Sequence, residues 1–243
     1  MPAVISKSLM SAIAIVAGSF LAVPAADAST TIPDVTISAH SGNNPFVNFS
    51  ASNYGSAWGN PDGTYNFNGG TSLQGFSLAW SMQIGPQPEF VVANFVVTNV
   101  SAITQTFVLE VTVPIVNPLA SSLIGGSVQG TVTDLNGNGA TVASNSPAPI
   151  YSALIDGSTV ATLLNDPFST SAGNFESANI GPAEFGGPVI PSQPGPAVAN
   201  TIGIRLEFTL TAGDSASFTS IFVVAVPGPG GLAILAFAGV LTR

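Results

Sequence analysis

Few residues in this chain are of types that perform acid–base chemistry. His40 is the only histidine, so a serine–histidine–acid triad would need this ring as its base, and a histidine-rich metal site is excluded. The sequence contains no Gly-x-Ser-x-Gly nucleophile elbow. Because His40 opens a turn-like run of Ser, Gly and Asn, we expect an exposed loop histidine with no catalytic role.

Carboxylate pairs can act without histidine, as in glycoside hydrolysis, where one acid protonates the leaving group and the other attacks or activates water. Most acids of this chain fall in turns or at outward strand positions, which favours a role in solubility. We therefore predict that the protein is not an enzyme and has no catalytic residue. The acids considered are Asp34, Asp62, Glu89, Glu110, Asp134, Asp156, Asp166, Glu176, Glu184, Glu207 and Asp214.

A run of Asp and Asn from Asp134 to Gly139 matches the opening of a calcium-binding loop, in which alternate oxygens face the ion. The bidentate acid that such a loop requires near its end falls on Asn145, which has no charge. A single carboxylate binds a hard dication weakly. We therefore predict a plain hairpin turn at this run, with no metal site and no cofactor.

Aromatic residues offer the better binding hypothesis. Tyr54, Trp58 and Tyr65 lie close together in the sequence among Gly, Asn and Asp. Flat rings on a loop could stack against sugar faces while the amides and carboxylates bond the hydroxyls, so these three residues are the predicted ligand-binding site. The alternative is that they plug one end of the fold. Trp80 lies within an expected strand and is predicted to be in the core.

Composition excludes several classes of function. The chain has 3 basic against 12 acidic residues and a formal net charge of −9, so it has no basic patch to neutralise nucleic-acid phosphates. It contains no cysteine, which excludes thiol catalysis, zinc–thiolate sites and iron–sulfur clusters. The many Ser, Thr, Asn, Gly and Pro residues favour strands and turns over helices.

Alternating apolar and polar residues predict strands at Gln105–Val113 and Thr201–Leu210. Similar runs, closed by Gly, Pro, Asn or Asp, bring the total to about ten. We therefore predict an all-β fold, a single antiparallel β-sandwich that is jelly-roll-like. The other expected strands are 34–39, 46–50, 63–67, 73–84, 90–100, 127–134, 140–144, 150–155 and 159–164.

Two dipeptides predict tight hairpins, because they accept the positive φ angles that such turns require. They are Asn136-Gly137, between the strands near 131–133 and 140–142, and Asp156-Gly157, between 151–155 and 159–163. The segment 167–200 is rich in Pro and Gly, and we expect it to be a long loop.

Both ends of the chain have the pattern of processing signals. Residues 1–28 combine Lys7, an apolar stretch and Ala26-Asp27-Ala28, which is typical of a secretory signal peptide cut by signal peptidase before Ser29. One β-sandwich domain is expected over 29–225. Residues 226–243 form a separate apolar segment, too short to span a bilayer alone.

The tail supplies a resemblance. Val226, Pro227, Gly228 and Pro229 are followed by a Leu/Ala-rich stretch and a terminal Arg243, which resembles the carboxy-terminal sorting signal of bacterial PEP-CTERM proteins. Gly replaces the Glu of the family's Val-Pro-Glu-Pro pattern, and a single Arg replaces its basic cluster. The resemblance implies recognition by an exosortase-like membrane enzyme and delivery to the cell surface or extracellular matrix.

Two functions therefore remain open. The first is an exported, non-catalytic cell-surface or extracellular-matrix protein, in transient contact with the membrane through its tail. The second is a secreted carbohydrate-binding β-sandwich that holds an extracellular polysaccharide with Tyr54, Trp58 and Tyr65.

Overall fold

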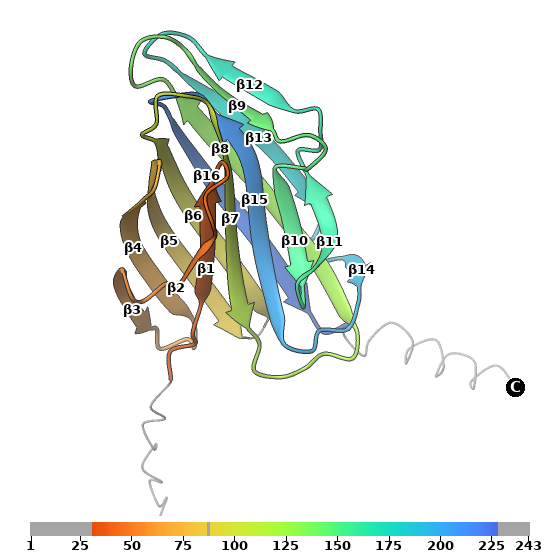
Figure 1. Ribbon diagram of the computed structural model, residues 1–243. Coiled ribbons are helices and arrows are strands. Elements are labelled where there is room, and N and C mark those ends of the chain that lie inside the picture. The colour runs from red at the N-terminus through yellow and green to blue at the C-terminus, as the bar shows by residue number, and fades with distance from the viewer. Residues whose placement is uncertain (1–30, 87, 228–243) are drawn as a thin grey trace, which may run out of the picture.

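The structure of the protein, a computed structural model, describes residues 31–86 and 88–227 (Figure 1). These described residues contain no helix. Their sixteen strands form two antiparallel sheets that pack against each other. The predicted all-β antiparallel sandwich is confirmed, although with more strands than the roughly ten expected. The predicted signal peptide, and the tail beyond Pro227, lie outside the described residues.

The first sheet faces the viewer in Figure 1. Its strands run in the order β11-β10-β15-β7-β1-β2, while β9 pairs with β15 and β12 pairs with β9. Their bounds are β1 Thr36–Ser41, β2 Val47–Ser50, β7 Gln105–Pro114, β9 Ala140–Ser144, β10 Tyr151–Ile155, β11 Ser158–Leu163, β12 Ser169–Ala172 and β15 Thr201–Leu210.

The second sheet lies behind the first and runs β13-β8-β16-β6-β5-β4-β3, with β14 paired to β8. The bounds of its strands are β3 Gly55–Gly59, β4 Tyr65–Leu73, β5 Phe76–Pro86, β6 Glu89–Asn99, β8 Ser122–Thr133, β13 Ser177–Phe185, β14 Gln193–Gly195 and β16 Ser215–Ala225.

The core lies between the two sheets and follows from the period of two along each strand. The alternation predicted for Thr201–Leu210 directs every second side chain of β15 inward, and these side chains are buried: Ile202, Ile204, Leu206, Phe208 and Leu210. Phe208 packs on rings from both sheets, since its ring centroid lies 5.7 Å from that of Phe107 on β7 and 4.8 Å from that of Phe218 on β16. Trp80 is also buried, as predicted.

One of the two predicted hairpins is wrong. Ile155 pairs with Ser158 across Asp156-Gly157, so β10 and β11 form the expected hairpin. At Asn136-Gly137, however, the chain leaves β8 in the second sheet and enters β9 in the first. Gly137 has the positive φ of a turn residue, but the turn here changes sheets, because both neighbours of β8 are strands distant in sequence.

The segment 167–200 is also not a loop. It contains β12, which extends the first sheet, and β13 and β14, which pair with β8. These are edge strands, and many of their side chains stay exposed, so they need no continuous apolar run. Pro and Gly residues also interrupt β13 and β14, and no alternating pattern is visible in their sequence.

Buried polar side chains hold the loops at the upper end in Figure 1, which we call the upper pole. Asn99 is fully buried; its amide donates to the carbonyls of Ile103, Leu210 and Thr211 at 2.9 to 3.0 Å. Asp214 is also fully buried and accepts a hydrogen bond from the backbone N–H of Leu135. The bonds of Asn99 to Leu210 and Thr211, and of Leu135 to Asp214, join segments more than 75 positions apart in the sequence, so side chains cross-link the upper pole.

Candidate ligand-binding site

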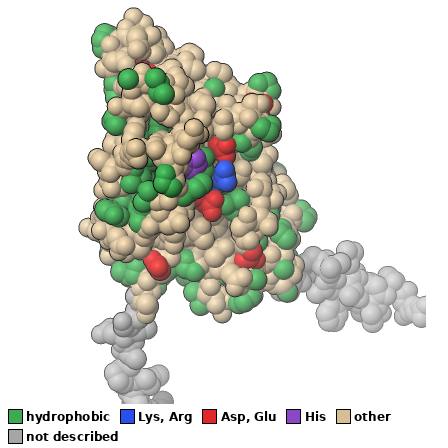
Figure 2. Space-filling view, viewed as in Figure 1, with side chains coloured by type: hydrophobic (Ala, Val, Ile, Leu, Met, Phe, Trp, Pro, Cys, Tyr) green, Lys and Arg blue, Asp and Glu red, His purple; other side chains and the backbone are tan. Residues whose placement is uncertain are grey.

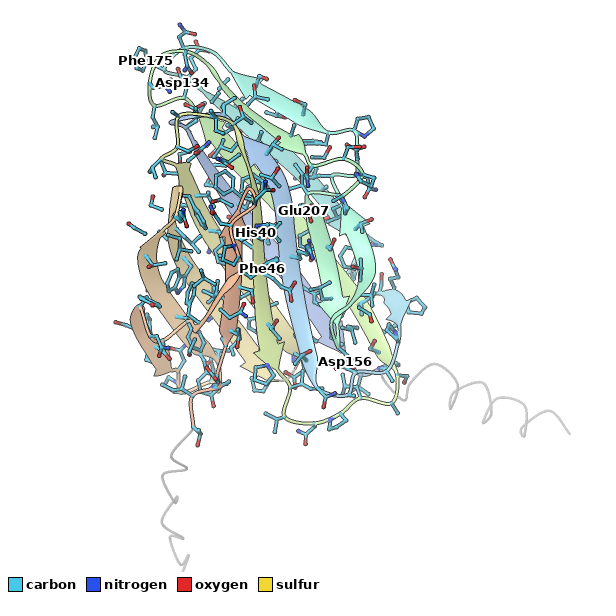
Figure 3. All side chains as sticks on the ribbon, viewed as in Figure 1. His40, Phe46, Asp134, Asp156, Phe175 and Glu207 are labelled. Atoms are coloured by element: carbon cyan, nitrogen blue, oxygen red, sulfur yellow. The ribbon has the colours of Figure 1, made fainter. Side chains whose placement is uncertain are left out.

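The chemically richest surface is the outer face of the first sheet. His40 on β1, Phe46 before β2, Asn145 after β9, and Arg205 and Glu207 on β15 line one shallow hollow of about 390 Å³. We call these five residues the polar patch. Figure 2 shows the histidine beside the only basic side chain of the described residues, with acidic side chains near it. Figure 3 places His40, Phe46 and Glu207 close together on this face.

Strand pairing brings these residues together from distant parts of the sequence. His40 is in register with Val108 on β7, and Val108 is in register with Glu207 on β15. Two residues away along β15, Arg205 is in register with Glu110. The outward positions of three adjacent strands thus collect the histidine, the arginine and two carboxylates into two neighbouring rows.

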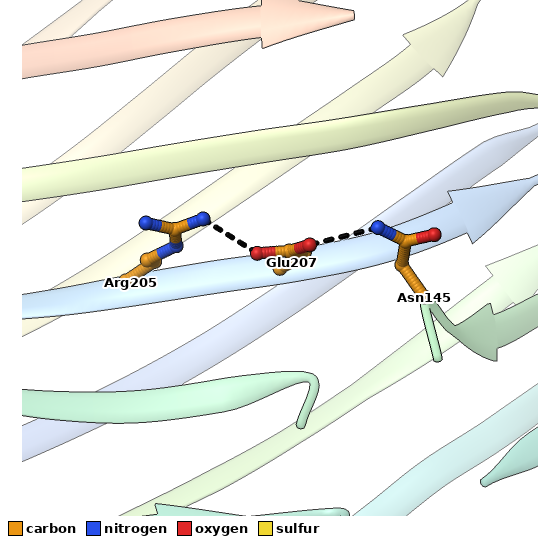
Figure 4. A network of polar contacts seen from close by, with 3 residues as sticks. All are labelled: Asn145, Arg205 and Glu207. Carbon is orange, nitrogen blue, oxygen red and sulfur yellow. Dashed lines mark hydrogen bonds and ion pairs between the residues drawn. The ribbon is translucent and has the colours of Figure 1, made fainter. Parts of the chain in front are cut away.

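Glu207 is held at both ends of its carboxylate (Figure 4). Arg205 Nη2 lies 2.6 Å from Oε2, and Asn145 Nδ2 donates to Oε1 at 2.8 Å. Both partners donate from N–H groups, so the two oxygens are fixed in position. The side chain of Arg205 remains 39% exposed, which leaves part of its guanidinium facing the hollow and solvent.

His40 lies on a strand and is half-buried, so the expectation of an exposed loop histidine is wrong. Its ring packs edge-on against Phe46, with centroids 4.1 Å apart, and its buried Nδ1 has no hydrogen-bond partner. Burial is the main cause that lowers the pKa of His40 below its ordinary value. The imidazole is therefore neutral near pH 7.

The polar patch has the features of a small-molecule site: a hollow, an aromatic surface and a few fixed polar groups. Phe46 is 49% exposed and offers a flat apolar ring, while Arg205 and Asn145 offer donors and Glu207 an acceptor. Such a set suits a ligand with one apolar face and hydroxyl groups at its rim, as in a pyranose ring.

The predicted aromatic site is only partly assembled. Trp58 lies on β3 and is 42% exposed; Tyr54 in the preceding turn is 50% exposed and stacks edge-on on Phe49. Tyr65 instead packs against the core at the start of β4. Trp58 pairs with Asn66, and Tyr65 is the next residue along β4, so the Trp58 and Tyr65 side chains point to opposite faces. Trp58 and Tyr54 thus lie at the sheet edge without Tyr65.

The Asp134 carboxylate faces backbone N–H groups. It accepts hydrogen bonds from the N–H groups of Asn136, Gly137, Gly139 and Phe175, all at the upper pole (Figure 3). Burial opposes its ionisation, but these bonds outweigh burial and lower the pKa to about 2. Its oxygens therefore serve to order the crossing between the sheets. Asn145, at the end of the calcium-like pattern, instead bonds Glu207.

Sequence reasoning identified the outward positions of Arg205 and Glu207 but missed their partners. Two opposite charges at alternate positions of one strand were the available signal, since they lie on the same face. Asn145 and Phe46 carried no comparable signal because pairing distant in sequence brings them to the patch. Of the sorting-signal residues, Val226 and Pro227 end the described chain, while Gly228 and Pro229 lie outside it.

Models of known protein families give no match to the chain, and curated proteins include no similar sequence. Among the residues described, no helix is long and apolar enough to cross a membrane. In residues 31–86 and 88–227, no group of three or more His, Cys, Asp or Glu side chains is arranged to hold a metal ion.

Proposed function

We propose that this chain is an exported, non-catalytic protein of the cell surface or extracellular matrix, which binds a neutral polysaccharide through the polar patch. The observation that carries the binding part is the hollow itself, with a half-exposed Phe46 beside a carboxylate fixed by two donors. The uncharged character of most of the surface agrees with this role, since charged residues are 6% of the chain.

The charges of the patch favour a neutral ligand over an acidic one. Arg205 is already paired with Glu207, and Glu110 stands in register beside it. With His40 neutral, the surroundings of the hollow carry one positive and two negative charges, so a uronic acid or phosphate would meet net repulsion. Hydroxyl groups, which both donate and accept, suit the available partners.

The same geometry supports a non-catalytic role. Glu207 is the one carboxylate among the described residues that line the hollow, so no second acid faces it there to complete the carboxylate pair of a glycosidase. His40 Nδ1 is buried and has no described hydrogen-bond partner. None of the described side-chain hydrogen bonds joins His40 to a serine or threonine hydroxyl, as a nucleophile and base pair would require.

Surface display is supported by where the described chain begins and ends. Thr31 lines a hollow with Glu89, and Glu89 also lines a second hollow with Val226, so both ends lie at the lower end of the sandwich in Figure 1, the lower pole. A tail sorted by an exosortase-like enzyme, after signal peptidase has removed residues 1–28, would hold the protein by this pole. The polar patch and the upper pole would then face outward.

We also propose that the sandwich is jelly-roll-like in connectivity. In support of this, the chain changes sheet at each step from β6 to β9 and again from β13 through β16, apart from the short β14 that stays beside β8.

The exposed aromatics of the sheet edge give a second candidate surface for the polysaccharide. Tyr54 and Trp58 are each about half exposed, so they are not buried at one end of the core. They lie on the sheet edge, however, and no described hollow is lined by them. They could extend a binding surface that the polar patch begins.

Affinity electrophoresis in gels containing a β-glucan, an α-glucan, a galactomannan or alginate tests the binding part. We expect retardation by a neutral polymer and none by alginate. Phe46→Ala should weaken the binding by ~10–100-fold, the loss expected when a phenyl ring no longer covers a ligand. Val100→Ala, at an exposed site of the upper pole, is the matched control. Trp58→Ala tests whether the sheet edge at β3 contributes to the binding. The proposal would be refuted if wild-type protein bound no neutral polymer.

Fractionation of cells tests the display part. Full-length protein should be cell-associated or cut near Pro229, whereas a chain that ends at Ala225 should be released into the medium with its fold intact. Equal location of the two proteins would show that residues 226–243 are not a sorting signal.

A further inference from the structure

The outer face of the second sheet carries a groove of its own. Two hollows, of about 370 and 520 Å³, lie over this face and adjoin each other, since Gln129 and Pro182 line both. Their volumes are in the range of small-molecule sites. We call the two hollows together the second-sheet groove. Its lining residues are 127–131 on β8, 179–184 on β13, and Ser217 and Thr219 on β16.

A bulge in β13 forms one wall of the groove. The register between β13 and β8 shifts there, so Gly181 and Pro182 together oppose the single residue Gln129. Gly181 has a φ of +75°, a left-handed conformation that glycine adopts without strain. Such a bulge bends the strand locally, and the exposed Pro182 lies where the two hollows meet.

The groove presents uncharged polar side chains in two rows that run across the strands. In one row, Gln129 on β8 is in register with Thr219 on β16. In the next row, Thr131 on β8 lies between Ser217 on β16 and Asn179 on β13. These positions alternate with residues that face the core, so all five side chains point outward.

The two amides of the groove are free to bind a ligand. The hydroxyls have partners: Thr131 and Ser217 bond each other at 2.8 Å, and Thr219 donates to Asn94 Oδ1 at 2.7 Å. In contrast, none of the described hydrogen bonds involves the side-chain amide of Gln129 or Asn179, and both residues are exposed. Each amide has an acceptor oxygen and two N–H donors, so each suits a hydroxyl group, which also donates and accepts.

The charge and polarity of the groove indicate the class of its ligand. Glu89 and Glu184 are the only charged residues in the described strands of the second sheet, and Glu184 alone lines the groove. A polyanion such as a nucleic acid would therefore meet no cation there. A protein partner would meet no apolar centre, because Pro182 is the one exposed apolar side chain of the lining. A neutral carbohydrate fits both conditions.

We propose that the second-sheet groove is a second binding site for a neutral polysaccharide, on the face opposite the polar patch, so that one molecule joins two polysaccharide chains. The joining of chains rests on the proposed function of the polar patch, whereas the groove is argued from its own lining. The outward side chains of the two sheets point in opposite directions, and the sheets themselves are ~10 Å apart, so one sugar unit cannot occupy both sites. The groove has no aromatic ring, and we expect it to bind more weakly than the patch.

Four proteins separate the two sites: wild type, Phe46→Ala, the groove variant Gln129→Ala/Asn179→Ala, and the combination of all three changes. Affinity electrophoresis uses whichever of the β-glucan, the α-glucan and the galactomannan retards wild type most. We expect Phe46→Ala to keep a weaker binding through the groove. Adding the groove changes should lower that remaining affinity by ~5–100-fold, the loss expected for two hydrogen bonds. Asn68→Ala/Ser81→Ala, at two exposed positions of the same face outside the groove, is the matched control.

Light scattering of the same polymer in solution measures the joining of chains. Wild type should raise the scattering to a maximum at an intermediate ratio of protein to polymer, because each molecule then bridges two chains. The groove variant should bind the polymer without raising the scattering. Melting temperatures and near-ultraviolet circular dichroism establish that each variant is folded.

The outcomes separate this inference from the proposed function. A groove variant that raises the scattering as wild type does would overturn the inference, as would groove changes that leave the binding of Phe46→Ala unaltered. If Phe46→Ala binds as tightly as wild type while the groove variant loses binding, the polar patch is refuted and the groove is the site. Wild type that binds none of the three polymers would refute both.

Discussion

Asn145 Nδ2 donates a hydrogen bond to Glu207 Oε1 at 2.8 Å, which joins the end of β9 to the middle of β15. The two residues are 62 positions apart in the sequence. This bond fixes the carboxylate from the side opposite to Arg205, so the acceptor geometry of the polar patch depends on a residue outside the strand that carries the acid.

Replacing Asn145 should weaken polysaccharide binding without loss of the fold. Asn145→Ala leaves the Glu207 carboxylate held by Arg205 alone. The carboxylate is then free to move in the unbound protein, and ligand binding has to fix its position again. We expect affinity to fall by ~3–10-fold, equivalent to one charge-assisted hydrogen bond or less. Isothermal titration calorimetry measures it, with the exposed Asn138→Ala as the control. Unchanged affinity would remove Asn145 from the site.

Asp134 should make the fold more stable above its titration range than below it. Its folded pKa of about 2 lies below the ordinary value of 3.8, so its stabilisation is present above pH 3.8 and is lost as the pH falls toward 2. Asp134→Asn cannot ionise and lacks this contribution. The difference in melting temperature between wild type and variant should therefore shrink over that window. Asn138→Ala, at an exposed position of the same loop, changes no titratable group and should show no such change, and a constant difference for Asp134→Asn would contradict the assignment.

Asn99→Ala should be strongly destabilising. The variant leaves three carbonyls at the upper pole without their donor, and a buried unsatisfied group costs ~1–3 kcal/mol. We expect the free energy of unfolding to fall by at least ~2 kcal/mol in urea titrations. Asn68→Ala, an exposed position on β4, should change it by less than ~0.5 kcal/mol. A loss as small as the control's would show that water replaces the amide.

Tyr151 should contribute one hydrogen bond to the core. Its ring is fully buried between the sheets, and its hydroxyl donates to the carbonyl of Ile221 on β16 at 2.8 Å. Tyr151→Phe keeps the ring and removes the donor, so we expect a loss of ~0.5–1.5 kcal/mol in the free energy of unfolding. Tyr65→Phe is the matched control, because none of the described hydrogen bonds involves its hydroxyl. Equal melting temperatures for Tyr151→Phe and wild type would contradict the expectation.

The strands with one buried face were predictable because their pattern is local. On β7 and β15 the side chains alternate between core and solvent, and this period appears in the residues themselves whatever the partners are. The same logic placed Arg205 and Glu207 outside. It did not find β13, which carries Pro and Gly and packs as an edge strand, or β3, which places Trp58 on a strand within the segment expected to be an aromatic loop.

By itself, the sequence determined the all-β class, the buried faces of the regular strands and the hairpin at Asp156-Gly157, because these depend on side-chain period and on backbone conformations that a few residues allow. Only the tertiary structure decided that Asn136-Gly137 crosses between sheets, that His40 lies beside Glu207, and that Glu89 is buried at the pole where the described chain begins and ends. Each of these depends on which strands become neighbours. That choice is made by the packing of the whole core, since any amphipathic strand can pair with many others.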